Sequence, residues 1–134
     1  MTETTSIDQV LDIAIIGAGP GGISAAHALA TLGFSIGIFE RARALRPIGA
    51  ALGLSDKGYE ALAAINPDLK SQVRALAVNP KHQMLIRPNQ EVLFAGESPL
   101  AGTPFTWLSW YYQQTCLEKL LPQNVSVNLN HALI

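Results

Sequence analysis

One stretch decides the fold of this chain, namely residues 12–41, DIAIIGAGPGGISAAHALATLGFSIGIFER. It opens with a short apolar run that ends at a glycine and closes with a second apolar run at residues 34–40. Between them lies an alanine-rich helical segment from Gly21 to about Leu32, which Gly33 should stop. A strand, a helix and a strand within roughly 30 residues form a βαβ unit. The sequence therefore predicts an α/β, Rossmann-like dinucleotide-binding fold with a parallel sheet, whose first strand is buried on both faces.

The glycines of this stretch follow the pattern Gly17-x-Gly19-x-x-Gly22. Gly17 allows a tight turn out of the strand, Gly19 lets backbone approach a pyrophosphate, and Gly22 lets the helix pack closely on the sheet. The helix N-terminus then offers N–H groups and partial positive charge to the phosphates. Small residues keep the loop compact around the ligand, namely Ala18, Pro20 and Gly21. The alternative is a glycine-rich turn that binds nothing.

An acidic residue, Glu40, ends the second apolar run roughly 20 residues beyond the glycines. A carboxylate at this point accepts hydrogen bonds from the hydroxyls of an adenosine ribose. The same charge repels a 2′-phosphate, which disfavours NADP at this site. NAD and FAD both carry a free ribose, so the spacing alone leaves both of them open.

The rest of the chain alternates between short helices and β-like runs. We expect irregular structure from residue 42 to 54, and helices that begin after Ser55 and at Asn66-Pro67. Residues 77–105 are expected to form a β-hairpin and loop insertion, with its turn at Pro88-Asn89-Gln90. A helix stopped by Pro122 and a third strand near residues 124–134 should follow.

Composition bounds the function of the chain. The 134 residues are expected to form one domain over 1–134, with 49% hydrophobic and 14% charged residues. The formal net charge of −1 gives no reason to expect nucleic acid or an anionic membrane as a partner. Glycines and a histidine interrupt the apolar stretch 13–39, so no membrane span is expected. The start, MTETTSIDQV, lacks the basic region of a signal peptide, and the cytoplasm is the expected location.

The residue types that bind metals are sparse and scattered. The single cysteine, Cys116, can form no disulfide within the chain and is expected to be a buried structural thiol. The three histidines, His27, His82 and His131, lie far apart and are read as structural or surface residues. We therefore expect no metal site, and no residue reads as a catalytic acid, base or nucleophile.

Four features together resemble one enzyme family. They are the turn GAGPGG, the pair Glu40-Arg41, the segment Arg46-x-x-Gly49 and the helix that follows it. In these features the chain resembles the N-terminal region of FAD-dependent monooxygenases of the aromatic-ring hydroxylase type, related to para-hydroxybenzoate hydroxylase. The likeness is strong from Ile13 to about Ile65 and looser to the end of the chain.

This resemblance implies a glutathione-reductase-like FAD-binding fold, with the hairpin insertion starting the substrate-side sheet. It implies that Glu40 and Arg41 hold the adenosine ribose and neighbouring groups. The segment from Arg46 through Gly49 and Ala50 would run beside the flavin half of the cofactor. The complete enzyme would use NAD(P)H to reduce FAD, and O₂ to hydroxylate a small organic substrate.

The chain departs from the family pattern in two places. Trp110 stands where the family usually has an FAD-holding arginine, while Gln114 is expected to donate a side-chain hydrogen bond to the cofactor. The family also continues beyond the third strand, so the fold is expected to be incomplete at the C-terminus. A second chain or a C-terminal half would then cover the open edge of the sheet.

Two other readings remain open beside the oxidoreductase. The first is a non-catalytic module or subunit that binds FAD or an ADP group and is completed by another chain. The second is an NAD-binding Rossmann domain of a dehydrogenase, against which the hairpin insertion argues.

Overall fold

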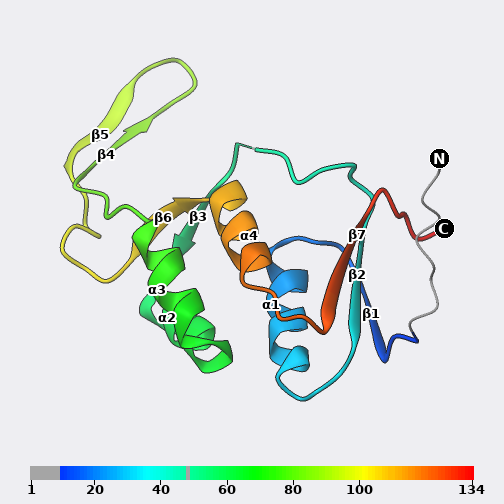
Figure 1. Cartoon of the computed structure of the whole chain (residues 1–134). Coiled ribbons are helices and arrows are strands. Elements are labelled where there is room, and N and C mark those ends of the chain that lie inside the picture. Colours follow the sequence, from blue (N-terminus) through cyan, green and yellow to red (C-terminus); the bar gives the residue numbers. More distant parts are fainter. Residues whose placement is uncertain (1–9, 48) are drawn as a thin grey trace. The chain divides into compact units, whose positions relative to one another are not determined.

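The computed structural model describes residues 10–47 and 49–134 (Figure 1). Residues 1–9, which contain most of the start of the chain that lacks the basic region of a signal peptide, lie outside the described residues. The described residues form two compact units, one made of 10–46 and 114–134 and the other made of 47 and 49–113.

The first unit is built on a parallel three-stranded sheet (Figure 1). Its strands are β1 (Ile13–Ile16), β2 (Ile36–Glu40) and β7 (Val125–Leu129), in the order β1-β2-β7. Helix α1 (Pro20–Ala30) connects β1 to β2, and both strand pairs are parallel. The predicted βαβ unit and the third strand are therefore confirmed.

The core of this unit lies between α1 and the sheet. Ile23 and Ala26 of α1, and Ile36 and Ile38 of β2, are all at most 1% exposed. The expectation that β1 is buried on both faces is wrong, because Ile16 is 55% exposed. Alternate side chains of a strand point to opposite faces, and the side of the sheet that packs on α1 is the better covered one.

One polar side chain, that of Asn124, joins the chain before β7 to the turn between α1 and β2. The Nδ2 of Asn124 donates to the carbonyl oxygens of Ala30 at 3.1 Å and Phe34 at 2.7 Å, at either end of the turn between α1 and β2. Gly33 adopts the positive φ of 90° that this turn requires. These two bonds fix both ends of the turn to the chain that enters β7.

Helix α4 (Trp110–Lys119) contributes its later residues to the first unit. Leu117 is fully buried, and its carbonyl oxygen lies 2.8 Å from the Nε2 of the buried His27. Cys116 is buried as expected, and this burial raises the pKa of its thiol. Among the described residues, no helix combines the length and apolar character needed to cross a membrane.

The second unit contains two helices and two antiparallel strand pairs. Helices α2 (Asp56–Ile65) and α3 (Pro67–Ala75) meet at Asn66, whose Oδ1 accepts from the Asp68 N–H at 2.9 Å. Ser55 is the N-cap residue of α2, but its side chain makes no capping bond.

The stretch expected to be irregular up to residue 54 contains a strand. Residues Ala51–Leu54 form β3 and pair with β6 (Thr106–Ser109). The expectation was wrong because β3 has only four residues, two of them small, and its pairing partner lies over 50 residues away. Tyr59 supports this sheet from α2, with its hydroxyl oxygen 2.6 Å from Thr106 Oγ1.

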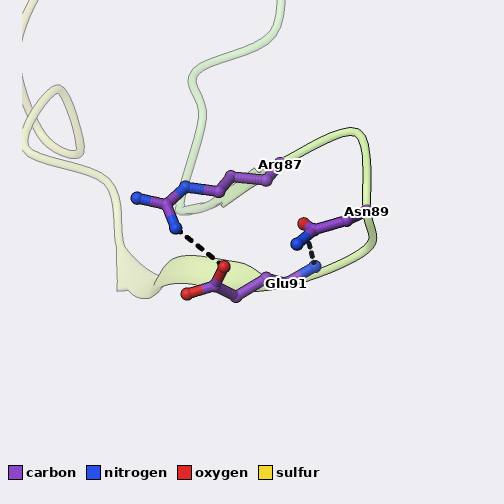
Figure 2. A network of polar contacts seen from close by, with 3 residues as sticks. All are labelled: Arg87, Asn89 and Glu91. Carbon is purple, nitrogen blue, oxygen red and sulfur yellow. Dashed lines mark hydrogen bonds and ion pairs between the residues drawn. The ribbon is translucent and has the colours of Figure 1, made fainter.

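The expected hairpin is formed by β4 (His82–Ile86) and β5 (Val92–Glu97). Its turn is held by backbone and side chains together (Figure 2). The Arg87 N–H donates to the Glu91 carbonyl oxygen, while Arg87 Nη1 lies 2.8 Å from Glu91 Oε2. The Oδ1 of Asn89 accepts from the Glu91 N–H at 3.2 Å. Gln90 takes a positive φ of 68°, a position where such loops favour glycine.

We expect Gln90→Gly to stabilise the hairpin. The left-handed conformation destabilises the folded state by about 1–2 kcal/mol for a residue other than glycine. Glycine removes this cost, but its greater freedom in the unfolded chain destabilises the folded state by about 0.5–1 kcal/mol. Amide hydrogen exchange of β4 and β5 should slow by about twofold to fivefold. Asn89→Gly is the matched control and should speed exchange, because it removes the hydrogen bond to Glu91. Faster exchange in Gln90→Gly would contradict the assigned turn.

Candidate functional site

The loop between β1 and α1 is held at both of its ends. The Gly17 N–H donates to the Phe39 carbonyl oxygen at 2.8 Å, which extends the β1–β2 pairing into the loop. Gly17 then turns with a φ of 101°, a conformation open to glycine. Gly19 is the N-cap of α1, and its carbonyl accepts the Ile23 N–H at 3.0 Å. The predicted strand–turn–helix context of the glycine motif is thus present.

The N-terminus of α1 can receive an anion. Pro20 occupies the first helical position and has no N–H, while the N–H groups of Gly21 and Gly22 precede the first intrahelical bond. No acidic residue lies in the first turn, and no side chain caps it. Free amides and the helix dipole together favour phosphate at this point.

The third glycine of the motif permits the close approach of helix and strand. A Cβ built on Gly22 would lie 2.1 Å from the Gly17 carbonyl oxygen and 3.4 Å from Ile15 Cγ2. The distance of 2.1 Å to the Gly17 carbonyl oxygen is too short for any side chain at residue 22. By contrast, a Cβ on the adjacent Gly21 would meet nothing within 4 Å.

Glu40 bonds to the backbone on both sides of its carboxylate. Its Oε2 accepts from the Ala18 N–H at 2.9 Å, and its Oε1 accepts from the Ala42 N–H at 2.8 Å. These bonds hold the pKa of Glu40 below its usual value, Ala18 having the larger effect, and the charge of Arg41 adds to it. Each carboxylate oxygen has a second lone pair and can accept a further hydrogen bond.

A cavity of about 340 Å³ opens beside Glu40 within the first unit. The chain after β7 forms part of its wall, because the Asn130 N–H donates to Ala42 O and the His131 N–H donates to Glu40 O, both at 2.9 Å. The residues that line it come from three segments of the unit: Ile16, Gly17, Phe39, Glu40, Arg41, His131, Ala132 and Leu133.

Sequence reasoning missed the part of this wall that follows β7. The sequence predicts His131 to be a structural or surface residue, and its ring packs edge-on against Phe39 with 5.9 Å between centroids. A usable signal was present, because the carboxyl ends of parallel strands meet at one edge of a sheet. The predicted parallel sheet therefore implies that the residues just after the third strand lie beside Glu40.

Gln114 lies against the glycine loop. Its side chain is 8% exposed, and its Nε2 donates to the Ala18 carbonyl oxygen at 2.6 Å. Trp110, four residues earlier, is the first residue of α4, and its backbone N–H donates to the Ala50 carbonyl oxygen at 2.9 Å.

The remaining expected site residues divide between the two units. Arg41 lines the cavity beside Glu40, whereas Arg46 is exposed and does not line it. Gly49 and Ala50 line an apolar cavity of about 510 Å³ within the second unit. Its other walls include two aromatic side chains and one serine. The full set is Gly49, Ala50, Ala51, Leu76, Val78, Trp107, Leu108, Ser109 and Tyr112.

Comparison with known proteins identifies the family of this fold. A family model described as "FAD binding domain" matches residues 10–127. The FAD-dependent monooxygenase pigN of Monascus ruber is 32% identical over 94 residues, which cover 70% of this chain and 20% of that protein. The chain thus spans about a fifth of the length of this relative.

Solved structures show the same fold at low sequence identity. The flavin-dependent monooxygenase PieE, solved in complex with FAD and substrate, superposes with a TM-score of 0.72 and 15% identity over 93% of this chain and 24% of its own. The tetrameric form of 2-methyl-3-hydroxypyridine-5-carboxylic acid oxygenase gives a TM-score of 0.67 and 19% identity, over 87% of this chain and 30% of its own.

We expect Gly22→Ala and Gly21→Ala to have opposite effects. The first forces a methyl group against the Gly17 carbonyl and should lower the free energy of unfolding by about 1–3 kcal/mol. The second adds a methyl group to open space on a helix and should be neutral or raise that free energy by up to about 1 kcal/mol. Urea unfolding of both variants measures the difference, and equal effects would contradict the close approach.

Glu40 should make the stability of the chain depend on acid pH. A lowered folded pKa means that the stabilisation is complete above the unfolded pKa and is lost as pH falls through the folded value. The free energy of unfolding should therefore fall between about pH 5 and pH 3. In Glu40→Gln the decrease in the free energy of unfolding should be smaller. The control Glu97→Gln changes a carboxyl group in the other unit and should show the full decrease. An unchanged pH dependence in Glu40→Gln would contradict the assignment.

Proposed function

Because this chain belongs to the family of FAD binding domains, we propose that it is the cofactor-binding part of an FAD-dependent monooxygenase that hydroxylates a small organic substrate. The observation that carries the proposal is the position of Glu40. Its carboxylate bonds to the glycine loop and also lines a cavity at the same edge of the sheet. In this proposal the phosphate site and the ribose site are adjacent.

The residues present fit the adenosine diphosphate half of FAD. The N-terminus of α1 offers the amides of Gly21 and Gly22 to the pyrophosphate. Glu40 retains acceptor capacity for the ribose hydroxyls. We infer that the cavity beside it takes the adenine, with Phe39 and Arg41 as part of its wall.

The flavin half of the cofactor is proposed to lie along the segment that contains Gly49 and Ala50. This part of the proposal is supported by the family resemblance and by the apolar cavity that these residues line with Trp107 and Tyr112. Flat ring systems pack favourably on aromatic side chains. Arg46 precedes this segment and is proposed to face the cofactor through its guanidinium group.

FAD, when bound and reduced by NAD(P)H, supplies the electrons with which O₂ hydroxylates an organic substrate. The residues of this chain bind the cofactor, orient it and exclude water from the backbone of the glycine loop, since Ala18 is fully buried. We assign no acid, base or nucleophile to the described residues.

The free edge of β1 belongs to the same proposal. In the described residues β1 pairs with β2 alone, and Ile16 on it is largely exposed. We propose that a further strand covers this edge, supplied by a later part of the protein or by a second chain. An uncovered apolar strand is otherwise prone to pair with other molecules.

FAD binding is measured first by the visible absorption spectrum of the chain after FAD is added and the mixture is desalted. We expect a retained flavin spectrum, and competition by ADP. Gly19→Val should abolish binding, because a branched side chain would occupy the place of the pyrophosphate. Glu40→Ala should weaken it by about 1–3 kcal/mol, the scale of lost hydrogen bonds to a charged group.

Glu97→Ala serves as the matched control, since it removes a carboxylate from the hairpin of the second unit. It should leave the affinity for FAD unchanged. Full affinity in Glu40→Ala would mean that the adenosine lies elsewhere, and a chain that binds neither FAD nor ADP would contradict the proposed function.

A further inference from the structure

The two peptide groups that flank Ala18 are held by side chains from distant parts of the chain. The N–H of Ala18 is bonded to Glu40 Oε2 at 2.9 Å, and its carbonyl oxygen to Gln114 Nε2 at 2.6 Å. Ala18 itself is fully buried, and Gln114 is 8% exposed. The centre of the glycine loop is thus fixed by one residue at the end of β2 and one residue of α4.

We propose that Gln114 is a positioning residue, which orients the Ala18–Gly19 peptide so that an N–H group, and not a carbonyl oxygen, faces the phosphate site. This inference rests on the proposed function. The described chain contains no cis peptide bond, and in a trans peptide the C=O and N–H point in opposite directions. Holding the Ala18 carbonyl on Gln114 therefore directs the Gly19 N–H away from Gln114.

The loop needs such a bond because its own residues do not select this orientation. Gly19 has a φ of −70°, and turning the peptide over would carry this angle into the positive range. A residue with a side chain would resist the change, but glycine populates both ranges about equally. A turned peptide would present a carbonyl oxygen to the pyrophosphate and repel it. The amide of Gln114 opposes that turn from outside the loop.

Gln114 acts on the cofactor through Ala18 and does not contact it. The neighbouring Gln113 provides a matched comparison, since it is similarly buried at 7% exposed. The side-chain oxygen of Gln113 has no hydrogen-bond partner in the described part of the chain. Replacing it by leucine removes a buried amide from the same helix without removing a bond to the glycine loop.

Three variants test the proposal, namely Gln114→Leu, Gln114→Glu and the control Gln113→Leu. Binding of ADP and of FAD is measured by titration between about pH 5 and pH 8. Gln114→Leu should weaken both affinities by about 10- to 100-fold at every pH, because it leaves the buried Ala18 carbonyl without its donor. Gln113→Leu should bind like the unsubstituted chain.

Gln114→Glu distinguishes positioning from a general loss of structure. At pH 8 its carboxylate cannot donate and faces the Ala18 oxygen, so binding should be weak. Burial raises the pKa of a carboxyl, and the protonated form donates through its O–H. Binding should therefore recover as pH falls toward 5, while Gln114→Leu shows no recovery. Gln114→Leu with unchanged affinity, or no recovery in Gln114→Glu, would overturn the proposal.

A measurement without ligand separates this proposal from the proposed function. Relaxation dispersion of the Gly19 amide in the ligand-free chain should show microsecond-to-millisecond exchange in Gln114→Leu and none in Gln113→Leu. Identical profiles in these two variants would overturn the positioning role. If the unsubstituted chain binds neither ADP nor FAD, the proposed function fails, and the Gly19 profiles alone decide whether Gln114 holds the peptide.

Discussion

The close approach of Gly22 to the Gly17 carbonyl is the constraint on which the first unit depends. With only hydrogen at residue 22, α1 can begin directly against the loop that leaves β1. Its N-terminal amides are thereby brought to the carboxyl edge of the sheet, where phosphate is bound in folds of this kind. A side chain at this one point would separate the helix from the strand and move the amides away from the edge.

Three segments meet at that edge because all strands of the sheet run in one direction. They are the glycine loop after β1, Glu40 at the end of β2, and the residues that follow β7. Backbone bonds from Asn130 and His131 continue the pairing of β2 and β7 beyond the strands themselves. The cavity beside Glu40 is therefore formed by the geometry of a parallel sheet, with few side chains specialised for it.

The glycine loop has almost no side chains with which to stabilise itself. Its buried polar groups are bonded to Glu40 and Gln114, which lie 22 and 96 residues away along the chain. Leaving such groups unbonded would cost about 1–3 kcal/mol each, so these two residues decide whether the loop keeps one conformation. The loop that we propose for the cofactor is thus ordered by bonds to the surrounding fold, without any ligand.

The sequence by itself determined the βαβ unit, the turn at Gly17 and the place of Glu40 at the end of the second strand, because glycine spacing and apolar periodicity are local signals. It also indicated the hairpin, whose turn residues are contiguous. Only the tertiary structure decided that β3 pairs with β6, that Ile16 faces outward and that Gln114 bonds to Ala18. Each of these features depends on packing or pairing between segments that are far apart in the chain, and a local sequence pattern does not predict such contacts.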